Sequence, residues 1–177
     1  MSESIFNAVT TISRDEKVAT VAPEYSIFIG GGGNIPDGNG SFQDDILVKE
    51  NFCIGDVKVT LQNFVHTWVG DLVVRLRHVE TNTVVDLFRR PGQPKFSSSG
   101  YCSDLKGDYS FNNYSNLDFE VAAGEHELIP SGNYASAQSL STLGGISSTG
   151  TWRLIINDCS AGDSGSLGSW KLELSKN

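Results

Sequence analysis

The sequence is poor in cysteine, in long apolar runs and in targeting signals. Its 177 residues hold only three cysteines, Cys53, Cys102 and Cys159, which is too few for a dense disulfide framework. One bridge with a free thiol and three reduced thiols both stay open, and the spacing matches no zinc-binding pattern. No run approaches the roughly 18 apolar residues of a membrane-spanning helix. The first twenty residues lack a basic n-region and an apolar h-region, so no secretory signal is visible and the compartment stays open.

Positive charge is also in short supply. Thirteen Lys and Arg stand against 21 Asp and Glu, which gives a formal net charge of −8. A surface of this sign repels the phosphates of nucleic acids and anionic membranes, and it collects cations. We therefore expect neither a nucleic-acid partner nor membrane insertion. The apolar share of 38% and the charged share of 19% are typical of one globular domain.

Short stretches of alternating polarity are abundant. They cover residues 46–48, 57–61, 72–76, 83–88, 152–156 and 170–174. An apolar residue at every second position is typical of antiparallel strands with one solvated face, and no segment keeps a helical period over three turns. Many short strands separated by turn residues predict an all-β jelly-roll β-sandwich, with Trp152 and Trp170 in its core.

The glycine run 30–33 is the strongest break in the sequence. Four glycines in a row favour a linker or a flexible turn, and no Lys-Ser/Thr follows them as in a phosphate loop. We therefore expect an N-terminal extension over 1–33 and a jelly roll over 34–177. The extension contains a strand-prone stretch at 17–30. This stretch can fold back on its own sandwich, stay disordered, or add to a sheet edge of a neighbour, which would make a self-assembling structural subunit.

The string Gly-Asp-Ser-Gly at 162–165 matches the surroundings of the nucleophile in trypsin-like proteases. Only about a dozen residues follow Ser164, too few to complete the substrate pocket of such an enzyme. The triad also needs a histidine and a buried aspartate. His66 and His78 lie on or beside predicted strands, and His126 lies in a charged loop. We interpret the string as a connection between two strands and predict that the chain is not an enzyme.

Several short motifs follow one another between residues 34 and 175. In chain order they are His66-Thr67-Trp68, Gly70-Asp71-Leu72, Gly150-Thr151-Trp152, Asn157-Asp158, Gly165-Ser166-Leu167 and Trp170. Their identity and order resemble the P domain, or Homo B domain, of subtilisin-like proprotein convertases. The resemblance implies a jelly roll without catalysis of its own, which in convertases stabilises the adjoining protease and adjusts its dependence on calcium and pH. It also implies a protein partner such as a protease, and an extracellular or cell-surface setting.

Calcium is the cofactor that the sequence predicts. Asp71 opens one predicted strand and Asp158 closes another, so they meet at one end of the sandwich if the strands are antiparallel neighbours. Asp163 and Asn113 can join them, since Ca²⁺ takes six to eight oxygen ligands. The competing interpretation is that these aspartates only cap turns.

Aromatic residues in or near predicted loops give a further alternative. They are Trp68, Tyr101, Tyr109, Phe111, Tyr114 and Tyr134. Exposed rings stack on sugars, which would make a carbohydrate-binding module, whereas packing under long loops is the favoured interpretation. The leading hypothesis is a non-catalytic, P-domain-like module for stabilisation or protein–protein interaction.

Overall fold

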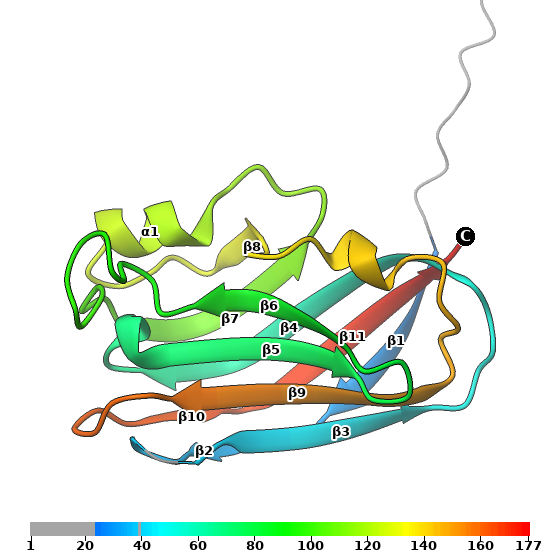
Figure 1. Cartoon of the computed structure of the whole chain (residues 1–177), viewed down its shortest axis with the longest axis horizontal. Coiled ribbons are helices and arrows are strands. Elements are labelled where there is room, and N and C mark those ends of the chain that lie inside the picture. Colours follow the sequence, from blue (N-terminus) through cyan, green and yellow to red (C-terminus); the bar gives the residue numbers. More distant parts are fainter. Residues whose placement is uncertain (1–23, 39) are drawn as a thin grey trace, which may run out of the picture.

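The computed structural model describes residues 24–38 and 40–177, and it confirms the predicted all-β jelly-roll sandwich (Figure 1). The strands are β1 (Tyr25–Gly30), β2 (Gly33–Ile35), β3 (Phe42–Val48), β4 (Ile54–His66), β5 (Leu72–His78), β6 (Thr83–Arg89), β7 (Leu105–Asn112), β8 (Gly132–Ala135), β9 (Gly150–Asp158), β10 (Gly165–Leu167) and β11 (Ser169–Lys176). The helical turns are η1 (Val69–Asp71), α1 (Phe119–Glu125) and η2 (Leu140–Leu143). Within the described residues, none of these helices is long or apolar enough to cross a membrane.

The strands form two facing sheets. The larger has the order β1-β11-β4-β10-β2, with β7 on the free side of β4 and β8 beside β7. The smaller has the order β3-β9-β5-β6 and lies in front of the larger one in Figure 1. Every strand pair is antiparallel except β7 with β8. The long strand β4 contacts three strands of the larger sheet and connects its two halves.

The core lies between the sheets and is built by the alternation seen in the sequence. Trp152 and Trp170 are both 0% exposed, as predicted. Beside α1 the core is aromatic, and its rings meet edge to face or tilted. Tyr109, Phe111 and Tyr134 belong to this buried cluster, so three of the aromatics considered for sugar stacking are not available at the surface.

The described part of the N-terminal extension folds back on its own sandwich. Strand β1 pairs with β11 from Tyr25 opposite Ser175 to Gly30 opposite Trp170. The glycine run that suggested a flexible linker is instead closely packed, because a Cβ on Gly30 would overlap the Trp170 indole and one on Gly32 would overlap the backbone around Gly168. Residues 1–23, which include the start of the strand-prone stretch, lie outside the described residues.

Candidate functional site

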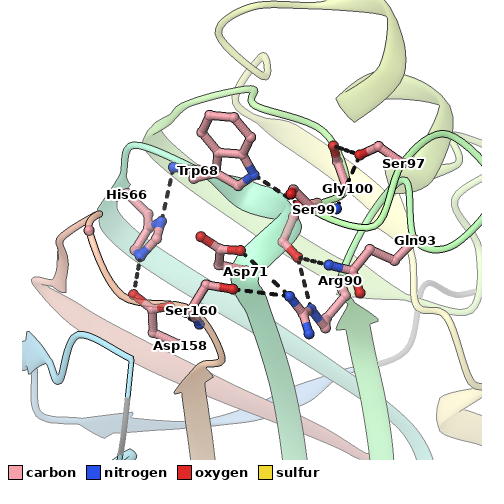
Figure 2. Close-up of polar contacts among 12 residues, drawn as sticks. His66, Trp68, Asp71, Arg90, Gln93, Ser97, Ser99, Gly100, Asp158 and Ser160 are labelled. Carbon is pink, nitrogen blue, oxygen red and sulfur yellow. Dashed lines mark hydrogen bonds and ion pairs between the residues drawn. The ribbon is translucent and has the colours of Figure 1, made fainter.

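A group of polar side chains lies at one end of the sandwich, where β4 and β9 finish and β5 begins. We call it the polar end cluster, and it consists of His66, Asp71, Arg90, Asp158 and Ser160 (Figure 2). Strands β5 and β9 are antiparallel neighbours with Leu72 opposite Asp158, so Asp71 and Asp158 come to the same end. Asp71 is 3% exposed and Asp158 is 2% exposed. Carboxyl groups so deeply buried need internal partners.

Asp158 finds its partners in the imidazole of His66 and in its own loop. The Nε2 atom of His66 lies 3.0 Å from Oδ2 of Asp158, and both side chains are fully buried. The other ring nitrogen, Nδ1, accepts the backbone N–H of Trp68 at 3.1 Å. Nε2 therefore carries the hydrogen and donates a hydrogen bond to the Asp158 carboxylate. The second oxygen, Oδ1, accepts the N–H of Ser160 at 3.1 Å and closes the turn after β9.

Asp71 is held by Arg90. A guanidinium nitrogen of Arg90 lies 3.6 Å from the Asp71 carboxylate, and the same side chain donates to the Gly70 carbonyl and the Ser160 hydroxyl. Burial raises the pKa of the Asp71 carboxyl, and the charges of Asp158 and Asp163 raise it further. The Ser160 hydroxyl and the Arg90 charge act in the opposite direction. The cluster is thus short of positive charge relative to its carboxyl groups.

Asp163 approaches the cluster from the loop between β9 and β10. Its Oδ1 accepts the Thr67 hydroxyl at 2.8 Å, which ties this loop to the residue after β4. Gly165 begins β10 opposite His66, and an added Cβ there would collide with the carbonyl of Val65 and the ring of His66. Two residues of the Gly-Asp-Ser-Gly string therefore have a structural explanation. One tethers the loop, and the other lets β10 pass close to the histidine.

Asn113, the remaining predicted calcium ligand, lies at the opposite end of the sandwich. Its side-chain amide donates to Asp56 near the start of β4, and Tyr25 donates to the same carboxyl group. Asp56 and His66 are ten residues apart on β4, which is about 33 Å in an extended strand. The structure thus brings Asp71, Asp158 and Asp163 together and leaves Asn113 apart.

Most of the sandwich matches the model of a known protein family. Residues 54–174 match the model of the proprotein convertase P-domain. The chain belongs to the P-domain family. Among curated proteins, none matches the sequence.

Two solved structures from Aeromonas sobria are similar to this P domain over most of its length. One is the complex of a serine protease with its chaperone ORF2, at 16% identity, a TM-score of 0.49, and coverage of 86% of this chain and 27% of that chain. The other is the serine protease alone, at 16% identity, a TM-score of 0.48, and coverage of 89% of this chain and 28% of that chain. The P domain thus spans less than a third of either chain.

The polar end cluster fits a calcium ion in part. Within residues 24–38 and 40–177, no three His, Cys, Asp or Glu side chains are gathered closely enough to hold a metal ion. Both oxygens of Asp158 already accept hydrogen bonds. Arg90 is paired with Asp71, so a bound cation would have to compete with its guanidinium group for that carboxylate. What favours a cation is the like-charge repulsion among Asp71, Asp158 and Asp163.

The same cluster is poorly arranged for nucleophilic catalysis. A histidine base needs one ring nitrogen directed at the nucleophile while the other is held by its orienting partner. In His66, Nδ1 is occupied by the Trp68 backbone and Nε2 by Asp158. The chemistry available here is internal hydrogen bonding, in keeping with the P domain as a non-catalytic module of convertases.

Sequence reasoning missed His66 and Arg90 as members of this site. The sequence places His66 only on or beside a predicted strand, and its burial follows from the pairing of β10 beside it. Arg90 has a positive φ of 41° directly after β6, which turns its side chain back toward Gly70. The one signal in the sequence was Gly165 at the end of the loop that carries Asp163, and this signal does not reveal which residue lies beside the glycine.

Proposed function

We propose that this P domain is a non-catalytic module that binds a partner protein and stabilises it. The observation that carries the proposal is family membership over residues 54–174. Further support comes from the polar end cluster, in which the buried histidine and carboxyl groups serve one another rather than a substrate. Because these buried groups are already paired with one another, we expect the domain to act through its surface.

The test begins with the tagged full chain as bait in extracts and culture fractions of its source, with cross-linking before capture. Each captured protein is then purified, and its thermal midpoint is measured with and without the domain. We expect at least one partner whose midpoint rises with domain concentration, because a ligand that binds only the native state stabilises it. An unrelated β-sandwich protein of similar negative charge serves as the control.

Two results would contradict the proposal. One is the absence of any captured protein whose stability depends on the domain. The other is hydrolysis of peptide or ester substrates by the purified chain that disappears in Ser164→Ala, since that would make the Gly-Asp-Ser-Gly string a nucleophile site. We expect wild type and Ser164→Ala to be indistinguishable in such assays.

Calcium binding at the polar end cluster is a second proposal. It is favoured by the proximity of Asp71 to the charges of Asp158 and Asp163. Ca²⁺ accepts carboxylates and backbone carbonyls in flexible geometry, so the backbone carbonyls of the loop 159–163 would supply further oxygens. Calcium would then stabilise the fold rather than take part in a reaction.

A further inference from the structure

The arginines of this acidic protein are gathered on one surface. The sequence contains six, and five of them lie on β5, β6 or β9 or directly after β6. They are Arg75, Arg77, Arg89, Arg90 and Arg153. In β5 and β9 the buried residues alternate with arginines, so Arg75, Arg77 and Arg153 stand on the outer face of the four-stranded sheet. Arg89 joins them from β6, opposite Val73, whereas Arg90 turns toward the polar end cluster. We call this outer face the arginine face.

The positive charge of the arginine face is only partly neutralised within the protein. Arg153 forms a two-pronged pair with Asp45 at 2.7 Å for each bond. Arg75 donates its Nε to Asp86 at 2.8 Å. Arg89 is 3.9 Å from the same Asp86, whose charge it must share with Arg75. Two arginines, Arg77 and Arg89, are thus in excess over the aspartates.

Arg77 is the most unusual of these residues. It stands directly opposite Arg153 in the β5–β9 pairing, and like charges in that position repel. Its Nε is buried and has no hydrogen-bond partner among the described residues. A buried donor without an acceptor costs free energy, and such groups are rare in folded proteins. Because this Nε is closed to solvent, Arg77 has to turn its side chain outward before an acceptor on a bound molecule can remove this cost.

The arginine face also has a hollow and apolar neighbours. A hollow of about 490 Å³ lies where β5 begins, with Arg75, Arg89 and Arg90 in its wall. On the same face Leu47 is 62% exposed and Val84, opposite Arg77, is 42% exposed. Arginine is enriched in protein interfaces, and the centre of such an interface is apolar.

We propose that the arginine face binds an acidic, extended segment of a partner protein, with carboxylates at Arg77 and Arg89. Arg89 stands opposite Val73, four residues before Arg77 on β5, so the two positions lie about 13 Å apart along the strand, which side chains i and i+4 of an extended peptide also span. Guanidinium groups bind carboxylates with two parallel hydrogen bonds. Long polyanions such as nucleic acid suit the site less, since the net charge of −8 repels them at longer range. The inference takes from the proposed function only the choice of a protein as partner.

The probe is a fluorescein-labelled peptide of alternating Glu and Thr, with a Gln and Thr peptide as its uncharged counterpart. Binding to the full chain is followed by fluorescence anisotropy at low and physiological salt. We expect the double variant R77Q/R89Q to bind the Glu peptide at least about tenfold more weakly than wild type. The matched control K106Q/K171Q removes the same charge from β7 and β11 of the other sheet, and it should bind within about twofold of wild type.

Four outcomes overturn the proposal: no binding of the Glu peptide by wild type, equal binding of the Gln peptide, equal weakening in both double variants, or tighter binding of heparin through the same arginines. The last would assign the face to sulfated glycans. The partner-capture experiment separates this inference from the proposed function. If R77Q/R89Q still captures and stabilises a partner, the proposed function is supported and the proposal for the arginine face is wrong. If the Glu peptide binds but no partner is stabilised, the arginine face is supported and the proposed function is wrong.

Discussion

The polar end cluster and the arginine face carry charge in opposite ways. In the cluster, Asp71 and Asp158 are almost fully buried, and Asp158 has a hydrogen bond to each oxygen. On the face, the Arg89 side chain is 56% exposed and Arg77 has a buried Nε without an acceptor. Buried charges with internal partners hold the loops of the sandwich in place. Charges left over at the surface are available to another molecule, and the following experiments test this contrast.

The largest effect is expected for Asp158→Ala. The change leaves the buried Nε2–H of His66 and the half-buried N–H of Ser160 without their acceptor, so we expect a loss of about 3 kcal/mol in the free energy of unfolding. Urea unfolding measures it. Asp163→Ala is the control, since its partner Thr67 is exposed to water and the loss should stay below about 1 kcal/mol. Equal losses in both variants would mean that burial does not distinguish them.

Thermal unfolding with and without calcium tests whether the polar end cluster binds Ca²⁺. With Ca²⁺ at about 100 times its dissociation constant, the native state gains about 2.7 kcal/mol, which raises the thermal midpoint by several degrees. The shift between calcium and excess chelator should vanish in Asp71→Ala. It should persist in Asn113→Ala, because Asn113 lies at the other end of β4. Identical curves for wild type would leave the aspartates as turn residues only.

A smaller effect is expected in the pH dependence of Asp71→Asn. Burial raises the folded-state pKa of Asp71 above its unfolded value near 3.9, so the native state holds this proton more tightly. The unfolding free energy of wild type therefore falls, relative to Asp71→Asn, as pH rises through the interval between those two pKa values. Urea unfolding at several values between pH 3 and 7 measures the difference.

Asp45→Asn is the control of opposite sign. The hydrogen bonds from Arg153 lower the pKa of Asp45, so its contribution to stability is present above the unfolded pKa and is lost as pH falls through the folded one. A difference between Asp71→Asn and wild type that stays constant with pH would show that folding does not raise the pKa of Asp71.

The smallest effect, and the only gain, is expected for Arg77→Met. Methionine keeps the apolar part of the side chain while removing a buried donor and the repulsion with Arg153. We expect the unfolding free energy to rise by less than about 1 kcal/mol. Arg153→Met, which breaks the pair with Asp45, should give no gain. A clear loss in Arg77→Met would mean that Arg77 already has a partner within the protein.

The architecture was predictable because alternation directly reports the two faces of a strand. It correctly assigned Trp152 and Trp170 to the core and brought Asp71 and Asp158 to one end. The helix α1 was not predicted, because its seven residues make only two turns and show no clear period. Its start is marked by Asp118, whose carboxylate caps the N–H of Glu120.

The details of the site depend on which strands are neighbours, and local sequence patterns do not report this. Strand β7 runs antiparallel to β4 and therefore ends beside the start of β4, which takes Asn113 away from Asp158. The arginine face also depends on strand register. The spacing of Arg75 and Arg77 is visible in the sequence, whereas Arg89 and Arg153 join them only through strand register. Local pattern gives the face of each strand, and only the fold gives its neighbours.

The pairing of β1 with β11 determines how the domain responds to tension. Tyr25 lies opposite Ser175, so the start of β1 and the C-terminus leave the sandwich side by side, away from the polar end cluster (Figure 1). A pulling force applied between these two points acts across the backbone hydrogen bonds at that end first. The bonds would open one after another, as in a zipper, rather than resist together in shear. The edge strand β1 would therefore separate from β11 under a light load while the rest of the sandwich stays folded.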